Sequence, residues 1–297
     1  MGSPIQRMVS VKRGRTGRAI TLRDKVVVIT GGGRGIGLAT AELLQERGAK
    51  VVLGDIDEEV VGKAAANLGC EGYPLDVTSD ESFAAFLDRV DKEFGRFDVL
   101  INNAGIMPTG PFLEFSDSLI KRNFEIDLLA VVRGCRLAAR RMVERGDGQI
   151  VNVASVAGLV PLPGLSIYSA AKAGVIAFSE ALDGELSMQG VRVLTVMPNF
   201  TKTGLIDGLQ TTALMRPIEP DDVARQIVQS IETNRDRVVI PEAEHGHPGV
   251  DGDPAVPQER LRPTLRFRLH VHGLRPGQAI QVPRAGHPQL ADDGGFG

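Results

Sequence analysis

The sequence predicts an α/β fold: a doubly wound parallel sheet of about seven strands, covered by helices on both faces in three layers within a single domain. Short runs of apolar, often β-branched residues alternate with helical segments over residues 24–243. The links between these segments are short, and such alternation brings strands into parallel order through crossover helices. The best-defined apolar runs are continuous, which is typical of a sheet buried on both faces.

The strands and helices can be assigned in chain order from these patterns. We expect strands at residues 25–30, 50–53, 71–77, 97–101, 149–154, 191–197 and 237–240. We expect helices at residues 38–47, 58–68, 79–94, 116–145, 166–188 and 219–233. Residues 199–217 look irregular, and their glycines and apolar side chains suit a mobile lid over an apolar substrate.

Two flanking segments differ in composition from the central domain. Residues 1–23 are basic and contain no acid, so we expect an N-terminal arm without fixed structure; a polyanion-binding or targeting role is the alternative. Residues 244–297 are rich in Pro and Gly, which favours a poorly ordered tail. His245 with His247, and His270 with His272, could bind a metal there, but the flexible tail is the preferred interpretation.

Composition narrows the possible partners and compartments. Of the 297 residues, 42% are apolar and only 4% aromatic, and Trp is absent, so the core must be aliphatic. A net charge of −3 gives no reason to expect nucleic acid or an anionic membrane as a partner. No apolar run reaches the ~18 residues of a membrane span. Cys70 and Cys135 lack metal-ligand spacing, so we expect a cytoplasmic protein without a metal site.

Histidine usage excludes two kinds of active site from the central domain. All 5 histidines follow Ala243. A Ser-His-Asp hydrolase and a His-ligated metal centre are therefore both excluded there. Any acid/base chemistry in this domain must use Tyr, Lys, Asp or Glu.

A glycine-rich loop lies between the first expected strand and the first expected helix. It reads Thr30-Gly-Gly-Gly-Arg-Gly35-Ile-Gly37, which is T-G-x-x-x-G-x-G. Glycines at these positions permit a tight turn and let backbone amides approach a pyrophosphate at a helix N-terminus. A glycine-rich turn alone is common, but a strand before it and a helix after it are the context that dinucleotide binding requires.

Asp55 indicates which dinucleotide is bound. It ends the second expected strand, near the ~20-residue spacing at which an acid binds the adenosine ribose hydroxyls. A carboxylate there repels a 2′-phosphate, so NAD is favoured and NADP is less expected. Arg34 in the glycine-rich loop is a counter-signal, because a cation there could bind that phosphate. The alternative for Asp55 is an ordinary surface acid at a strand end.

The segment from Ser155 to Lys172 contains the candidate chemistry. Ser155 follows an expected strand, Pro161 forces a loop, and Tyr168 and Lys172 then share one face of a helix because they are four residues apart. An ammonium beside a phenol favours the phenolate and lowers the pKa of the tyrosine, which makes it a usable general acid/base. Tyr-x-x-x-Lys alone is usually an ordinary helix pair; Ser155 and the glycine-rich loop make the catalytic interpretation much stronger.

Several motifs occur together in the order typical of one family. They are T-G-x-x-x-G-x-G, Asp76-Val77 after the third strand, Asn102-Asn103-Ala104-Gly105 after the fourth, the strand-end Ser155, and Tyr168-x-x-x-Lys172. Over residues 24–242 the chain resembles the short-chain dehydrogenase/reductase family. The resemblance implies a Rossmann-type sheet of seven strands and the NAD(P)(H)-dependent oxidation of alcohols or reduction of ketones.

The resemblance also implies roles for individual residues. Tyr168 would be the acid/base, Ser155 the partner of the substrate oxygen, and Lys172 the residue that binds the nicotinamide ribose and tunes Tyr168. Thr203 would contact the carboxamide. The expected cofactor-binding set is Gly31, Arg34, Gly35, Ile36, Gly37, Asp55, Asp76, Val77, Asn103, Tyr168, Lys172 and Thr203.

Two positions depart from the family pattern. Asp127 stands where the family usually has an Asn that supports a water-linked proton path to the lysine. Asp is isosteric with Asn but cannot donate a hydrogen bond when ionised, so Asp127 joins Ser155, Tyr168 and Lys172 as a catalytic candidate whose role is open. Asn199 replaces the glycine of the family's Pro-Gly pair, and Asn can still adopt unusual backbone angles.

Assembly and function can be stated as expectations. Residues 116–145 and 166–188 carry many small side chains, and family members commonly pair these helices across a two-fold axis, so we expect a homodimer or homotetramer. The leading interpretation is an NAD-dependent alcohol dehydrogenase or ketoreductase that acts on a small-molecule alcohol or ketone. A non-catalytic dinucleotide-binding sensor and a scaffold that works through the basic arm are the alternatives.

Overall fold

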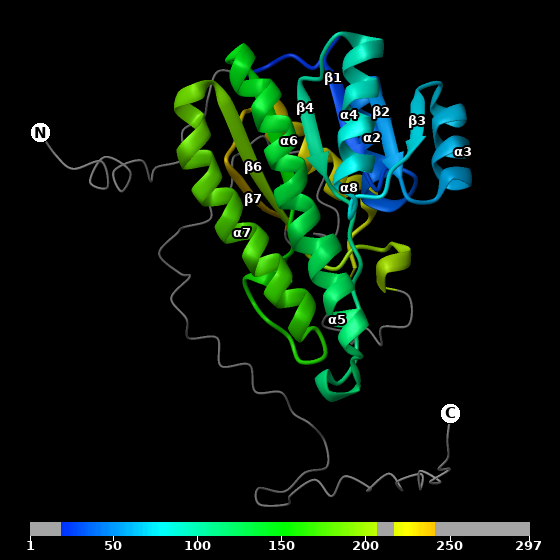
Figure 1. Ribbon diagram of the computed structural model, residues 1–297, viewed down its shortest axis with the longest axis vertical. Helices are drawn as coiled ribbons and strands as arrows, with labels where there is room; N and C mark the ends of the chain where they lie inside the picture. Colours follow the sequence, from blue (N-terminus) through cyan, green and yellow to red (C-terminus); the bar gives the residue numbers. More distant parts are fainter. Residues whose placement is uncertain (1–18, 207–216, 241–297) are drawn as a thin grey trace, which may run out of the picture. The chain divides into compact units, whose positions relative to one another are not determined.

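A computed structural model describes residues 19–206 and 217–240. It confirms the predicted α/β fold: seven parallel strands form one sheet in the order β3-β2-β1-β4-β5-β6-β7 (Figure 1). The strands are β1 (Val26–Thr30), β2 (Lys50–Asp55), β3 (Glu71–Pro74), β4 (Val99–Asn102), β5 (Gly148–Val153), β6 (Val191–Pro198) and β7 (Arg237–Ile240). Residues 1–18 of the predicted arm, residues 207–216 of the predicted lid and the predicted tail lie outside the described residues.

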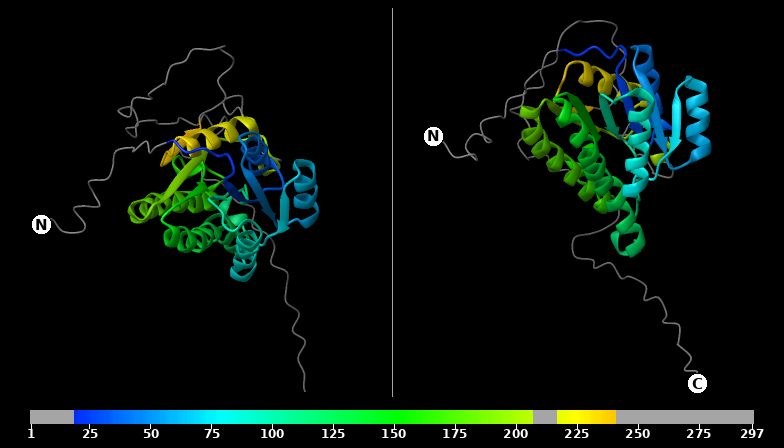
Figure 2. Two further views of the ribbon diagram at one scale, coloured as in Figure 1. Left: turned by 90° about the horizontal axis from the view of Figure 1, so that it is seen from above. Right: turned by 45° about the horizontal axis from the view of Figure 1, so that its top comes forward.

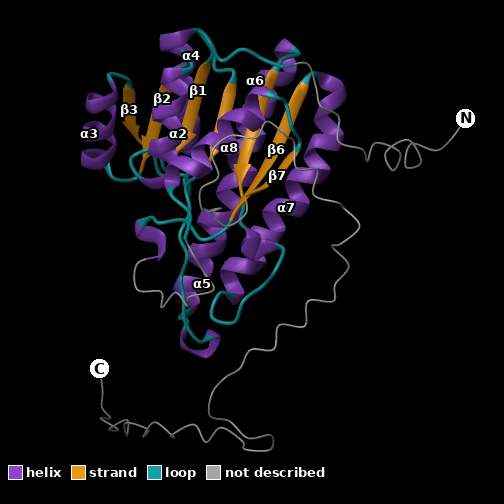
Figure 3. Ribbon diagram, turned by 180° about the vertical axis from the view of Figure 1, so that it is seen from behind, coloured by secondary structure: helices purple, strands orange, loops and turns teal. Residues whose placement is uncertain are grey.

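Helices cover both faces of the sheet, as Figures 2 and 3 show. One face packs against α4 (Asp80–Phe94), α6 (Ala130–Arg145) and α7 (Ser166–Leu186). The other packs against α2 (Gly35–Glu46), α3 (Glu58–Leu68) and α8 (Pro220–Glu232). Each face has its own apolar core cluster, and burial of each large aliphatic side chain contributes about 1.5–3 kcal/mol.

The central strands are the most deeply buried part of this arrangement. Every residue of β1 and β4 is buried, which agrees with their continuous apolar sequences. The strand order reverses between β1 and β4, because the chain winds from β1 toward β3 and then returns to continue from β4. Such a reversal opens a crevice at the carboxyl ends of the two strands, where ligands of doubly wound folds bind.

The predicted helix at residues 116–145 is interrupted. It consists of α5 (Asp117–Phe124), a π-helical turn (Glu125–Leu129) and α6, which follow one another without a break in the chain path. A π turn carries one extra residue per turn, so periodicity alone does not reveal it. The turn contains Asp127, whose side chain is fully buried. Such turns are frequent at functional sites.

Two further differences concern element ends. The third strand was expected to reach residue 77 but ends at Pro74, and Asp76 then closes a turn by accepting a hydrogen bond from the Thr78 amide at 2.9 Å. Residues 19–23, which we had assigned to the arm, pack on the domain: Leu22 is 2% exposed and the Ile20 amide donates to the Glu232 carbonyl at 2.8 Å. Within the described residues, no helix is both long and apolar enough to cross a membrane.

Candidate active site

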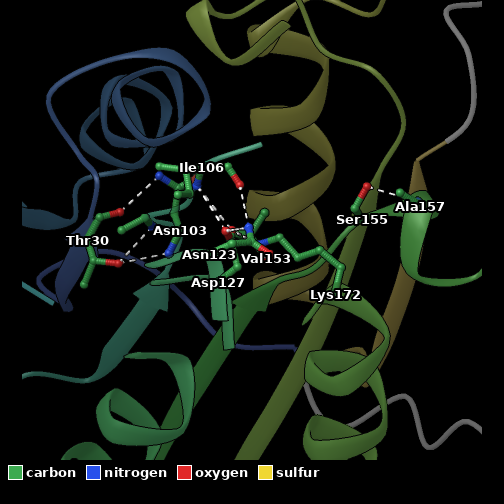
Figure 4. Close-up of polar contacts among 10 residues, drawn as sticks. Thr30, Asn103, Ile106, Asn123, Asp127, Val153, Ser155, Ala157 and Lys172 are labelled. Atoms are coloured by element: carbon green, nitrogen blue, oxygen red, sulfur yellow. Dashed lines mark hydrogen bonds and ion pairs between the residues drawn. The ribbon is translucent and has the colours of Figure 1, made fainter. Parts of the chain in front are cut away.

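Ser155, Tyr168 and Lys172 come together at the carboxyl edge of the sheet. Ser155 follows β5, and its Oγ accepts a hydrogen bond from the Ala157 amide at 3.1 Å (Figure 4). Tyr168 and Lys172 lie one turn apart in α7, and both are at most 5% exposed. The Lys172 Nζ lies 5.6 Å from the centre of the Tyr168 ring. The helix register therefore places the ammonium beside the phenol, as the sequence indicated.

Asp127 belongs to the same cluster through a direct ion pair with Lys172. The Lys172 Nζ lies 3.3 Å from the Asp127 Oδ1 and donates to the Val153 carbonyl at 3.0 Å (Figure 4). The Ile106 amide points to both carboxylate oxygens of Asp127 at 3.3 Å, and the Asn123 Nδ2 donates to Oδ2 at 2.6 Å. The strand β5, the loop after β4, the π turn and α7 thus all converge on one buried charge pair.

The two charged residues of this cluster have opposite effects on the pKa of Tyr168. Burial raises the pKa of the Tyr168 phenol, the Lys172 ammonium and the Ser155 hydroxyl act to lower it, and the Asp127 carboxylate acts to raise it. The net direction is upward, so the expectation that Lys172 leaves Tyr168 with a lowered pKa is corrected. Lys172 acts in the expected direction, but burial and Asp127 outweigh it.

The two members of the ion pair also depart from their ordinary titration. Burial raises the pKa of the Asp127 carboxyl to about 6, although the Lys172 ammonium and the Ile106 amide act against this rise. Burial acts to lower the pKa of Lys172, but Asp127 and Tyr168 outweigh it and leave the pKa above its ordinary value. Lys172 is therefore an ammonium at neutral pH.

The glycine-rich loop has no room for side chains at its key positions. A Cβ on Gly37 would lie 2.3 Å from the Gly31 carbonyl oxygen, and a Cβ on Gly31 would lie 2.9 Å from the Ala104 Cα. Gly31 and Gly35 also have positive φ angles of 63° and 56°. The first turn of α2 contains no acid and its N-cap residue, Arg34, makes no side-chain cap hydrogen bond. A tight glycine turn that leads into the N-terminus of α2, with no acidic side chain in the way, fits a pyrophosphate.

Asp55 and Arg34 are the two charged residues near this loop that were expected to influence the choice between NAD and NADP in opposite directions. The Asp55 carboxylate, 7% exposed, accepts hydrogen bonds from the Gly33 amide at 3.1 Å and the Asp57 amide at 3.2 Å. The position of this carboxylate is therefore fixed by the backbone, unlike that of an ordinary surface acid. Arg34 is exposed and pairs with Asp57 at 3.1 Å. Arg34 is thus already engaged with a carboxylate in this structure.

Other predicted cofactor residues have definite places around the loop. The side-chain Nδ2 of Asn103 donates to the Thr30 and Gly31 carbonyls, both at 3.0 Å, and so holds the glycine-rich loop in place. Thr203 packs over the loop, because a Cβ on Gly35 would lie 3.0 Å from its Cγ2. Ile36 is half-buried in α2, and Val77 is buried after β3.

Sequence reasoning missed Asn123 as a member of the site. Asn123 is fully buried, four residues before Asp127 on the same helical path, and it supplies the shortest hydrogen bond to that carboxylate. The available signal was the spacing Asn-x-x-x-Asp, which places both side chains on one face. Thr30 was quoted as the first residue of the glycine-rich motif but given no role of its own. Its Oγ1 accepts hydrogen bonds from the backbone amides of Asn103 and Ala104 at 3.0 and 3.1 Å.

Comparison with known proteins identifies the family. The family model described as short chain dehydrogenase matches residues 25–213. The chain belongs to the short-chain dehydrogenases, an NAD(P)-using oxidoreductase family. A solved crystal structure of gox2181 resembles it with a TM-score of 0.71 and 29% identity, over 75% of this chain and 96% of that one.

Two curated relatives show the range of the similarity. The chain is 36% identical over 272 residues to "Probable oxidoreductase EphD" of Mycobacterium tuberculosis, which covers 83% of this chain and 45% of that protein. The chain thus spans about half the length of this relative. It is 41% identical over 218 residues to "Cis-4-hydroxycyclohexanecarboxylate dehydrogenase" of Sinomonas cyclohexanicum, covering 69% of this chain and 88% of that one.

Proposed function

We propose that this oxidoreductase transfers a hydride between NAD(P)(H) and a secondary alcohol or ketone, with Tyr168 as the general acid/base. The observation that carries the proposal is that the Nζ of the buried Lys172 lies 5.6 Å from the buried Tyr168 ring, with the half-buried Ser155 hydroxyl also beside the phenol. A phenol, an ammonium and a hydroxyl that meet at the carboxyl edge of the sheet suit proton transfer to or from a single oxygen atom.

Each residue has a separate task in this proposal. The bound nicotinamide supplies or takes up the hydride. Tyr168 donates its phenolic proton to the oxygen of a ketone during reduction, and accepts the proton of an alcohol during oxidation. Ser155 hydrogen-bonds the same oxygen through its hydroxyl and fixes its position. Lys172 would hold the ribose of the nicotinamide half of the cofactor, and its ammonium favours the phenolate form of Tyr168.

NAD(H) is the cofactor that the charge arrangement favours. The Asp55 carboxylate is held by two backbone amides near the end of β2, so it cannot turn away from a 2′-phosphate. Arg34, the residue that could offset this repulsion, is paired with Asp57. Gly31, Gly35 and the amides that follow would hold the pyrophosphate, and Asp76, Val77 and Thr203 would line the remaining channel.

An apolar substrate is favoured by the side chains around the site entrance. Large hydrophobic side chains on the connections after β4, β5 and β6 are exposed, although apolar side chains are usually buried. They are Phe112, Leu113, Leu159, Val160 and Leu205. These connections all lie at the carboxyl edge of the sheet, where the cluster of Ser155 and Tyr168 is located. The name of the Sinomonas relative agrees with a cyclic secondary alcohol as one possible substrate class.

We propose further that the protein forms a homodimer or homotetramer through α6 and α7. An apolar groove of about 590 Å³ runs between these helices, lined among others by Val132, Ala139, Val143, Phe178 and Leu182. A second copy would bury this surface.

A cytoplasmic location is a further part of the proposal, because Cys70 and Cys135 are both free thiols, as is usual in a reducing compartment.

A substrate panel tests the proposed reaction. Cyclic and linear secondary alcohols and their ketones would be incubated with NAD(H) and NADP(H), and the change in nicotinamide absorbance would be followed. We expect turnover with apolar members of the panel and with NAD(H). Tight NADH binding without turnover on any member would favour the alternative of a dinucleotide-binding sensor.

A further inference from the structure

A buried ion pair stands where the family usually has a neutral amide, and its consequences rest on the function proposed above. The Asp127 side chain is fully buried and that of Lys172 is 5% exposed, and the two are 3.3 Å apart. A charge pair so deep in a protein persists only if hydrogen bonds satisfy its remaining polar atoms. The Ile106 amide, the Asn123 side chain and the Val153 carbonyl meet this requirement.

Few titratable groups act on this pair. Within the described residues, the pKa of Asp127 is affected by the Lys172 ammonium and the Ile106 amide, and the pKa of Tyr168 by the Lys172 ammonium, the Asp127 carboxylate and the Ser155 hydroxyl. The loop after β4 contributes only the backbone amide of Ile106, and α5 contributes the uncharged side chain of Asn123. The charge of Lys172 is therefore the main one that favours the Tyr168 phenolate, and the charge of Asp127 is the one that opposes it.

We propose that Asp127 is a positioning residue which holds Lys172 in an ion pair and, through its charge, raises the pH at which Tyr168 loses its proton. With Asp127 ionised, carboxylate and ammonium cancel, and the phenol has no net positive neighbour. With an uncharged residue at this position, the ammonium acts alone on the phenol. Tyr168 therefore keeps its proton at neutral pH, ready for donation to a ketone, and serves as a base toward an alcohol only at higher pH.

The size of the effect follows from the geometry. The Asp127 Oδ1 lies at most about 9 Å from the Tyr168 ring centre, since both are measured to the same Lys172 nitrogen at 3.3 and 5.6 Å. At an effective dielectric constant of about 20, one charge at that distance changes a titration midpoint by roughly one pH unit. Removal of the Asp127 charge should therefore lower the midpoint of Tyr168 by about one unit or more.

The composition of the chain allows a direct measurement. The sequence has only 2 tyrosines and no Trp, so Tyr73→Phe leaves Tyr168 as the single source of the tyrosinate absorbance band. Tyr73 lies in β3 and bonds to Glu71 and Glu93, away from the site. The full chain with Tyr73→Phe would be titrated with and without Asp127→Asn. We expect the second titration to have the lower midpoint, and the pH profile of alcohol oxidation to move in the same direction.

Asp127→Asn should be accommodated by the site. The Asn123 Oδ1 is buried without a hydrogen-bond partner, so a turn of that amide would provide an acceptor for the new donor. If Asp127→Asn does not fold, Asp127→Ser removes the same charge in a smaller volume, and the same fall in midpoint is expected. Asp98→Asn is the matched control. Asp98 is a buried acid paired with Lys25 at 3.1 Å near the other end of the sheet, and its loss should leave the Tyr168 midpoint in place.

The outcomes separate this inference from the proposed function. An unchanged or raised Tyr168 midpoint in a folded Asp127 variant overturns the inference, whether or not the enzyme turns over. An equal shift with Asp98→Asn overturns it as well, because the effect would not be specific to the site. A lowered midpoint in a protein without turnover on any alcohol or ketone supports the charge coupling and counts against the proposed reaction alone.

Discussion

Gly37→Ala probes the glycine-rich loop at the position where the structure leaves the least space. The added Cβ would lie 2.3 Å from the Gly31 carbonyl oxygen and 2.7 Å from the Asn103 Nδ2. The first of these atoms is backbone and cannot rotate away, so the turn itself must shift. Overpacking of this kind costs about 1–3 kcal/mol. If the cost falls on the cofactor-binding conformation, NADH affinity should drop by roughly 5- to 150-fold.

The matched control is a glycine in a helix where nothing obstructs a methyl group. Gly62 in α3 has no atom within 4 Å of its would-be Cβ. Gly62→Ala should stabilise the protein by about 0.5–1 kcal/mol through helix propensity and leave NADH binding as it was. Affinity would be measured by NADH fluorescence, and stability by thermal unfolding. If Gly37→Ala binds NADH as tightly as the natural chain, the close approach of α2 to the loop does not shape the cofactor site.

Three further predictions concern cofactor choice, Lys172 and assembly. NAD(H) should bind at least tenfold, or ~1.4 kcal/mol, more tightly than NADP(H), and Asp55→Asn should narrow that ratio in paired titrations; equal affinities in the natural chain would show that Arg34 prevails. Lys172→Ala should reduce kcat and also weaken NADH binding, because the same ammonium is proposed to assist Tyr168 and to bind the cofactor ribose. A loss of kcat with unchanged NADH binding would show that Lys172 does not bind the ribose. Leu182→Glu should convert a dimer or tetramer to monomers in light scattering, and a natural chain that is monomeric at micromolar concentration would refute the assembly proposal.

The strand and helix order could be predicted from sequence because both signals are local. A continuous apolar run such as Val26–Thr30 indicates a strand that is buried on both faces. The helices with a side-chain N-cap, such as α3 and α4, begin within one residue of the predicted position. The interruption at Glu125–Leu129 could not be predicted in this way. The extra residue of a π turn shifts the helical register of the residues after it. The contacts of Asp127 in this turn are with Ile106 and Lys172, which are remote in sequence.

The site was predictable where short spacings define it. Tyr168 and Lys172 share a helix, and the glycines of the loop are adjacent in the chain, so their arrangement follows from local geometry. The electrostatic balance was not predictable in the same way. It depends on how deeply Tyr168 is buried and on the 3.3 Å separation of Lys172 from Asp127, neither of which a one-dimensional pattern contains. The position of Asn123 against that carboxylate is different, because its four-residue spacing from Asp127 was a local signal that the sequence analysis did not use.

The most direct test of the proposed chemistry is the turnover of Tyr168→Phe. This change removes the phenolic proton, keeps the ring and leaves the glycine-rich loop as it is. We expect kcat on an apolar secondary alcohol to fall by about 10²–10⁴-fold, the usual contribution of a positioned general acid/base, while NADH affinity changes little. Retained turnover in Tyr168→Phe, with NADH bound as before, would contradict the role of Tyr168.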